Sequence, residues 1–222
     1  MPTTQTTPLV ARGLLLDMDG TLVNSDAVVE LIWRGWAARH GIDPDEVMRV
    51  AHGRQGHSTM ATVLPDRPME ENYAENAELL AEETKITEGI VPVPGAPAFM
   101  EALAPLPHAL VTSADIGLAT VRMRVAGVRM PDIRITSESV SASKPDPEGF
   151  LKGAAELGFD AADCVVFEDS PAGVAAGRAA GMRVVGVGER AAALEPTVHV
   201  RDLTQLRVEA LPDGRIALHV AA

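Results

Sequence analysis

Short apolar runs recur along the chain, and helical patterns fill the stretches between them. The runs cover residues 14–16, 109–111, 133–135, 164–167 and 183–187. Each consists largely of apolar positions, which is typical of strands buried on both faces of a parallel sheet. Strands that alternate with helices predict a doubly wound, Rossmann-like α/β fold with helices on both faces of the sheet.

Proline and glycine mark the expected ends of two of these helices. Ser170 and Pro171 supply a cap residue and a first helical position, and Gly181 stops that helix. A second helix opens at 146–148 and ends at Gly158. Both helices follow predicted strands, as a βαβ arrangement requires.

The stretch from 24 to 94 interrupts the alternation because it shows helical patterning and no clear strand. One helix face is marked by Val28, Leu31, Ile32, Gly35 and Trp36, and residues 70–85 predict another helix. The stretch is too long for a loop, so we expect a small helical domain inserted into the core. The core would then comprise 9–23 and 95–222, with hinges near 22–26 and at the proline-containing segment 90–95.

The two ends of the chain predict different structures. Residues 207–218 place a turn between two apolar-bearing runs, which indicates a terminal β-hairpin. Residues 1–8 are polar, with neither the basic nor the apolar region of a secretion signal, and we expect a disordered tail. No apolar stretch approaches the ~20 residues of a membrane span. The expected location is cytoplasmic.

Composition narrows the classes of partner. The 19 basic and 31 acidic residues give a net charge of −12, which opposes binding to nucleic acid. A local cation or a set of backbone amides can still bind a small phosphate ester. The single cysteine, Cys164, excludes an internal disulfide and lies in an apolar run, where we expect it to be a buried core residue.

Candidate chemistry begins directly after the first strand. Asp17 and Asp19 stand two positions apart, and Gly20 lets the chain turn so that both carboxylates can face one pocket. On their own, these residues also fit a solvated turn or part of a calcium loop. They indicate a catalytic site only if other functional groups lie close to them.

Other predicted strands also end in polar residues. Thr112 and Ser113 follow the second strand, Lys144 lies beyond the third, and Glu168 and Asp169 follow the fourth. The carboxyl ends of parallel strands share one edge of the sheet, where ligands bind. Taken singly, each residue could cap a helix or lie in a solvated loop. Together they supply the groups for phosphoryl transfer with a divalent metal.

Four motifs in this order resemble the haloacid dehalogenase-like phosphatase superfamily. They are DMDGTLV, VTSAD, SKPDPEGF and VVFEDSPAG, and the resemblance covers the chain from about residue 13 to 188. The helical insertion resembles the C1-type cap of the branch that contains sugar phosphatases and β-phosphoglucomutases. Only the tail beyond about 195 lies outside the shared pattern.

The resemblance implies roles for individual residues. Asp17 would be the nucleophile that takes the phosphoryl group, and Asp19 would protonate the leaving alcohol and then deprotonate water. Thr112, Ser113 and Lys144 would bind the phosphate, with Thr112 and Lys144 counted among the catalytic groups.

The phosphate and metal sites are completed by the same loops. Gly20 would contribute to phosphate binding next to the nucleophile. Mg²⁺ would be held by Asp17, the backbone carbonyl of Asp19, and Asp169, with Glu168 as a further candidate ligand.

Two departures from the mutase pattern favour hydrolysis. β-Phosphoglucomutases have a histidine twelve residues after the nucleophile, where this chain has Val29. They also have valine directly after the DxDG, where this chain has Thr21.

The inserted domain contains a loop that resembles the substrate-specificity loop of C1 caps. It holds His52, Gly53, Arg54 and His57, and these residues could contact substrate hydroxyls when the cap closes. A solvated surface loop is the alternative. Trp33 and Trp36 are expected to pack within the cap, with Trp33 near enough to the first motif to touch the pocket.

The sequence therefore predicts a Mg²⁺-dependent phosphatase of small sugar or polyol phosphomonoesters. The expected partner is a small phosphorylated metabolite, and the expected state is a monomer or weak homodimer. The alternatives are a hexose-phosphate mutase and a phosphate-binding regulator without turnover. A dehalogenase fits less well because Asp19 would have no role.

Overall fold

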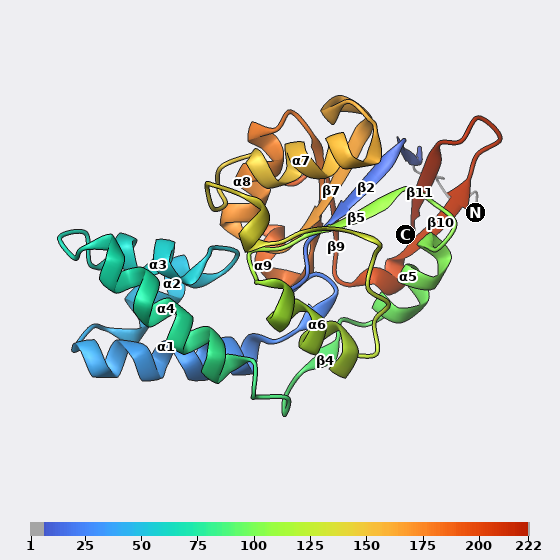
Figure 1. Ribbon diagram of the computed structural model, residues 1–222. Coiled ribbons are helices and arrows are strands. Elements are labelled where there is room, and N and C mark those ends of the chain that lie inside the picture. Colours follow the sequence, from blue (N-terminus) through green and yellow to red (C-terminus); the bar gives the residue numbers. More distant parts are fainter. Residues whose placement is uncertain (1–6, 222) are drawn as a thin grey trace.

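The core is a parallel sheet of six strands, and Figure 1 shows it between helices. The computed structural model describes residues 7–221, so the N-terminal part of the expected disordered tail, residues 1–6, lies outside the described residues. The strands lie in the order β6-β5-β2-β7-β8-β9, and all neighbours are parallel. Their bounds are β2 Gly13–Leu16, β5 His108–Val111, β6 Ile133–Ile135, β7 Cys164–Glu168, β8 Arg183–Val187 and β9 Val198–Val200. The predicted fold class is confirmed, and β9 is a strand that the apolar runs did not predict.

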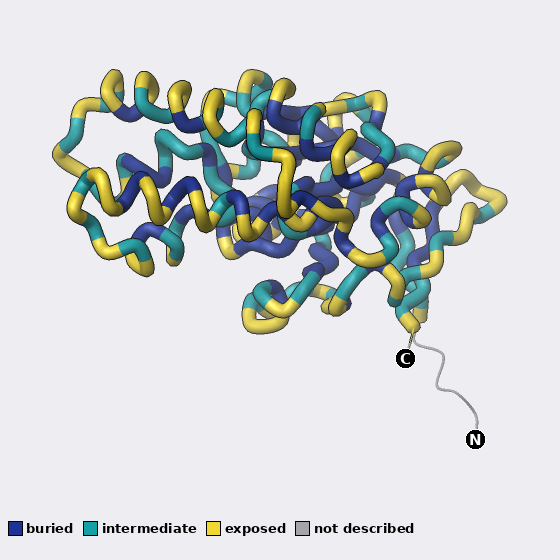
Figure 2. Tube along the Cα trace, turned by 90° about the horizontal axis from the view of Figure 1, so that it is seen from below, coloured by how far each residue is buried: buried dark blue, intermediate teal, exposed yellow. Residues whose placement is uncertain are grey.

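Alternate residues of the central strand feed two separate apolar clusters. Leu14 and Leu16 join residues of α5 (Ala96–Leu103) and α6 (Ile116–Val125) in one cluster. Leu15 joins residues of α7 (Glu148–Leu157) and α8 (Pro171–Ala179) in the other. Successive side chains of a strand point to opposite faces, so helices cover both sides of the sheet. The deeply buried stretches accordingly gather in the centre of the core (Figure 2).

Four helices are inserted after the first core strand. They are α1 Asp26–His40, α2 Pro44–Ala51, α3 Gly56–Val63 and α4 Met69–Glu83. Two short strands, β3 Val23–Asn24 and β4 Val91–Pro92, pair antiparallel where the chain enters and leaves this cap. These strands lie at the predicted hinges, although their movement and the division into 9–23, 24–94 and 95–222 stay predictions.

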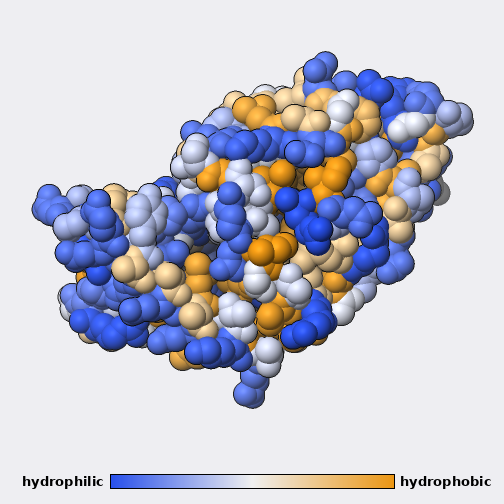
Figure 3. All heavy atoms as spheres, viewed as in Figure 1, coloured by the Kyte–Doolittle hydropathy of each residue, from blue (hydrophilic) through white to orange (hydrophobic). Residues whose placement is uncertain are grey.

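Helix α1 of the cap buries a face that differs in one residue from the face that the sequence pattern predicts. Val28, Ile32 and Trp36 are buried, but Leu31 is 62% exposed and does not belong to the packed face of α1. Trp33 is buried instead, and its side chain lines the cavity between the cap and the core. The face of the cap that Figure 3 shows is mostly hydrophilic.

The C-terminal segment forms the predicted hairpin within a larger sheet. Strands β10 Leu206–Ala210 and β11 Ile216–Val220 pair antiparallel. Strand β1 Leu9–Ala11 adds to the other side of β11, a pairing that the local sequence did not predict. The remaining helical segments are α9 Gly188–Ala192, η1 Ser137–Ser139, η2 Ala161–Asp163 and η3 Leu203–Gln205. Among residues 7–221, no helix is long and apolar enough to cross a membrane.

Candidate active site

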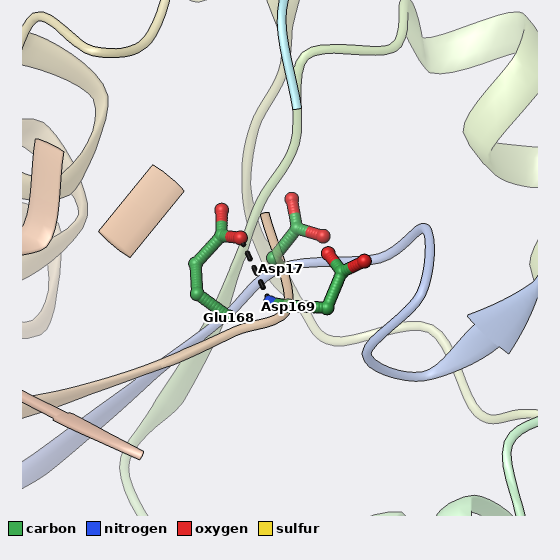
Figure 4. A group of neighbouring side chains, drawn as sticks. All are labelled: Asp17, Glu168 and Asp169. Carbon is green, nitrogen blue, oxygen red and sulfur yellow. Dashed lines mark hydrogen bonds between the residues drawn. The ribbon is translucent and has the colours of Figure 1, made fainter. Parts of the chain in front are cut away.

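Three carboxylates meet at the carboxyl edge of the sheet. Asp17 follows β2, Glu168 ends β7, and Asp169 follows it. One carboxylate oxygen of each lies within 4.8 Å of the others, and all three residues are buried (Figure 4). Since β2 and β7 are paired neighbours in parallel register, the end of one strand is brought against the end of the next.

Lys144 supplies the positive charge at this cluster. Its Nζ donates to Asp17 Oδ1 at 2.6 Å, to Glu168 Oε1 at 2.7 Å and to the carbonyl of Val111 at 3.0 Å. All three ammonium protons therefore have acceptors. Burial alone would lower the pKa of Lys144, but the charges of Asp17 and Glu168 outweigh it and raise that pKa above its usual value.

The cluster still carries an excess of negative charge. Burial and the nearby Glu168 carboxylate raise the pKa of Asp17 to about 8, although Lys144 opposes the rise. The same two causes raise the pKa of Asp169, against the effect of Arg190. Buried carboxylate oxygens in excess over cations fit a divalent ion such as Mg²⁺, which prefers oxygen ligands. The residues at this edge are therefore suited to a metal ion.

Glu168 differs from the two aspartates because both of its oxygens already have partners. Oε1 accepts from Lys144, and Oε2 accepts from the amides of Asp169 and Ser170 at 3.0 and 3.1 Å and from the Ser170 hydroxyl at 3.0 Å. Its side chain is fully buried. This carboxylate is placed to hold Lys144 and the loop after β7 in position.

Asp19 lies on the side of the site that faces the cap. Its Oδ1 accepts from the Ser25 hydroxyl at 2.7 Å, and its Oδ2 accepts from Arg122 Nη1 at 2.7 Å. Gly20 is required next to it, since its φ is +84° and a Cβ there would lie 2.1 Å from Asp169 Oδ2. The turn thus brings the backbone against the carboxylate cluster.

The polar residues after β5 connect the sheet edge to the cap. The Thr112 hydroxyl accepts from the amide of Ala114 at 3.1 Å. The Ser113 hydroxyl donates to the carbonyl of Gly53 at 2.9 Å, and the amide of Gln55 donates to Ser143 Oγ at 2.9 Å. The predicted cap loop therefore lies directly over the core loops.

A cavity of about 90 Å³ lies between the cap and the sheet edge. Its lining combines residues of both: Asp17, Asp19, Thr112, Ser113 and Asp169 from the core, and His52, Gly53, Arg54, Val29 and Trp33 from the cap. Burial and the charge of Arg190 lower the pKa of His52, which favours its neutral form. The predicted contact of Trp33 with the pocket is present in this lining.

One cap residue of the predicted set lies elsewhere. His57 is not part of the cavity lining, and its ring packs against Tyr73 with 4.7 Å between the ring centroids. His57 is the second residue of α3, and the helix turns its side chain toward α4 instead of toward the sheet edge.

Several charged residues at the site were not predicted from the sequence. Arg122 joins Asp19 to Glu83, the last residue of α4. Arg190 bonds Asp169, and also Asp26 at 3.0 Å. On α4, a spacing of i, i+3, i+4 and i+7 could have marked the cavity face, which holds Asn76, Leu79, Leu80 and Glu83. The arginines carried no comparable pattern.

The fold and the site together define a hydrolase with a parallel α/β core and an inserted helical cap. Residues 11–181 match the family of haloacid dehalogenase-like hydrolases. The chain belongs to this family, and the resemblance inferred from the four motifs is confirmed.

Similar proteins include phosphatases of small phosphate esters. Hexitol phosphatase A of Escherichia coli is 38% identical over 93% of this chain and 98% of its own. Glycerol-1-phosphate phosphohydrolase 2 of Saccharomyces cerevisiae is 35% identical over 83% of this chain and 78% of its own. Among solved structures, a β-phosphoglucomutase from Clostridium difficile has a TM-score of 0.77 at 20% identity, covering 89% of this chain and 93% of its own. At that identity the likeness concerns the fold.

Proposed function

We propose that this protein is a Mg²⁺-dependent phosphatase that hydrolyses small sugar or polyol phosphomonoesters through an aspartyl phosphate on Asp17. The observation that carries the proposal is the buried pair of Asp17 and Asp169, which line a cavity between the core and the cap, with Lys144 bonded to Asp17. Phosphomonoester hydrolysis is also the activity in the names of its relatives, which act on hexitol and glycerol phosphates.

The chemistry requires one covalent step and one hydrolytic step. An oxygen of Asp17 bonds to phosphorus as the bond to the leaving alcohol breaks, and Asp19 gives its proton to that alcohol. Asp19 then takes a proton from water, which attacks phosphorus and releases Asp17 and inorganic phosphate. Ser25 and Arg122 hold the Asp19 carboxylate in the cavity for both transfers.

The phosphate would be bound by groups from three loops. Gly20 lies outside the cavity lining, against the carboxylate of Asp169, so its part in phosphate binding stays a prediction. Lys144 Nζ donates to Asp17, and Thr112 and Ser113 line the cavity beside Asp17. These groups offset the charge of the phosphate as it meets a carboxylate nucleophile.

Asp17, Asp169 and the backbone carbonyl of Asp19 would hold Mg²⁺, with Glu168 in a positioning role because its oxygens are already engaged. When bound, the ion would reduce the repulsion between phosphate and carboxylates and polarise the phosphoryl oxygens.

The mutase alternative has less support. Val29 lines the cavity at the position where the mutase pattern has histidine, so the side chain at this position cannot act as a second acid or base. The cavity instead combines apolar side chains with His52 and Arg54. A cytoplasmic location and a monomeric or weakly dimeric state stay predictions.

Hydrolysis of p-nitrophenyl phosphate with Mg²⁺ and with EDTA tests the proposal. We expect phenolate release with Mg²⁺ and its loss in EDTA, restored by added Mg²⁺. A panel of hexitol, glycerol and sugar phosphates, assayed for inorganic phosphate, then ranks the substrates. No metal-dependent release from any of these compounds would contradict the phosphatase assignment and favour a binding protein without turnover.

A further inference from the structure

The cap and the core meet at an ion pair for which the hydrolytic steps give no reason. Glu83 at the end of α4 accepts a hydrogen bond from Arg122 Nη2, while Arg122 Nη1 donates to Asp19 Oδ2 at 2.7 Å. All three side chains line the cavity that contains Asp17. One guanidinium group therefore joins the proposed acid/base to a carboxylate of the cap.

This end of the cavity has two carboxylates for one cation. The side chain of Arg122 is 3% exposed and that of Glu83 is 13% exposed, so water screens their charges weakly. A guanidinium is always charged, and here both of its terminal nitrogens are taken by carboxylates. Burial raises the pKa of Glu83, and the charge of Arg122 opposes that rise. Among the described residues, the buried Nε of Arg122 has no hydrogen-bond partner, but two carboxylates share this one guanidinium, so a further anion would add to a net negative charge.

The opposite end of the cavity lies where the loop that carries Arg54 meets α4. A Cβ at Gly56 would lie 2.0 Å from Asn76 Oδ1, so the loop that carries Arg54 meets α4 at Asn76. Glu83 lies seven residues further along α4, which is about 10 Å at the rise of an α-helix. Leu79 and Leu80 line the cavity between these ends. Glu83 thus lies at the Asp19 end of the cavity, joined to Asp19 through Arg122, and this is the end where the leaving alcohol must lie.

We propose that Glu83 is a specificity-determining residue that accepts hydroxyl groups of the leaving alcohol and rejects a negative charge within two or three carbons of the phosphate ester. This inference rests on the proposed function, because it needs Asp19 to face the leaving oxygen. A neutral polyol can donate its hydroxyls to the Glu83 carboxylate. A carboxylate at the same place would meet Asp19 and Glu83 with only Arg122 between them.

Glycerol 3-phosphate and 3-phosphoglycerate test this selectivity, because they have the same carbon number and differ in one terminal group, CH₂OH or carboxylate. We expect the native protein to have a kcat/KM for glycerol 3-phosphate about 10-fold or more above that for 3-phosphoglycerate. Glu83→Gln should move this ratio toward 3-phosphoglycerate by about 10-fold, because it removes the repelling charge and frees one side of Arg122. Glu82→Gln changes the net charge equally on an exposed position of α4 and should leave the ratio unchanged.

The native protein alone can overturn the inference, so it does not depend on the folding of a variant. Equal kcat/KM for the two compounds would contradict it, as would an unchanged ratio in a folded Glu83→Gln variant. If the same preparation still hydrolyses p-nitrophenyl phosphate in a metal-dependent way, either of these results contradicts only the role of Glu83 and not the proposed phosphatase function. Absence of hydrolysis from all three compounds would overturn the proposed function and this inference together.

Discussion

The two halves of the candidate site are built in different ways. On the core side, Asp17, Glu168 and Asp169 are buried at the ends of two paired strands, and Lys144 uses all of its donors on them. On the cap side, His52 and Arg54 lie on a loop between two helices and are only partly buried. The core half has fixed partners, whereas the cap half leaves polar groups available to a ligand.

Under the proposed function, this difference places the chemistry in the core half and the substrate selectivity in the cap half. Groups that must hold a phosphate and a metal in one geometry benefit from a rigid sheet edge. Groups that read the alcohol portion of a substrate need free hydrogen-bonding capacity, which helix and loop residues of the cap retain. Changes in the core half should therefore affect every substrate equally, and changes in the cap half should affect substrates differently.

Asp17→Asn should have the largest effect. The amide keeps the shape of the side chain but is not a nucleophile, so turnover should fall by about 10⁴-fold or more for p-nitrophenyl phosphate and sugar phosphates alike. The fold should persist, since Lys144 keeps its contact with Glu168. Phosphate release and the thermal unfolding midpoint are the measurements. Substantial residual hydrolysis by a pure, folded variant would contradict the covalent mechanism.

Lys144→Met should reduce turnover by about 10²-fold or more and also destabilise the protein. Removing this buried ammonium leaves Asp17 and Glu168 as uncompensated carboxylates, and loss of one partner of a buried ion pair costs about 3–5 kcal/mol. Lys152→Met is the matched control, because Lys152 pairs with Glu148 at the surface, where water screens the pair and its contribution to stability is small. Urea unfolding measures both. If both variants lost the same free energy of unfolding, the buried cluster around Lys144 would stabilise the fold no more than a surface ion pair does.

Arg54→Ala should separate the substrates. Its guanidinium lines the cavity and, among the residues that the structure describes, makes only a long hydrogen bond of 3.4 Å to Thr62, so it remains available to a ligand. Loss of a charge-assisted hydrogen bond should raise KM for a sugar phosphate about 10-fold while p-nitrophenyl phosphate changes little. Arg49→Ala removes the same charge from an exposed position of α2 and is the control. The same rise in KM for both substrates would remove Arg54 from recognition of the alcohol.

The core half could be predicted from the sequence because a parallel sheet brings the ends of its strands to one edge. Once the apolar runs are recognised, the positions of Asp17, Thr112 and Asp169 follow without knowledge of side-chain packing. The strands that were missed have a different origin. Strand β1 depends on a partner at the far end of the chain, where Leu9 faces Leu218. Strand β9 is as short as β6, which was predicted, and nothing in its sequence explains the difference.

The cap half could be predicted only in outline. Helical periodicity identifies residues that share a face of α4, but it does not tell whether that face meets solvent, the cap interior or a cavity. The contact of Arg122 with Glu83 joins helices from two parts of the fold and depends on how the cap sits on the core. His57 shows the same limit, since its place in the loop motif suggested a ligand-binding role.

His57→Phe should have the smallest effect and tests the boundary of the cap half. The His57 ring packs against Tyr73 and lies outside the cavity lining, so phenylalanine can keep the aromatic contact. We expect kcat and KM for the best sugar or polyol phosphate to change less than about 2-fold, within the range of a substitution that removes no substrate contact. His52→Phe is the contrasting variant, because His52 lines the cavity and its neutral ring can hydrogen-bond a hydroxyl. If His57→Phe raised KM as strongly as His52→Phe, the surface that reads the substrate would have to extend past the start of α3.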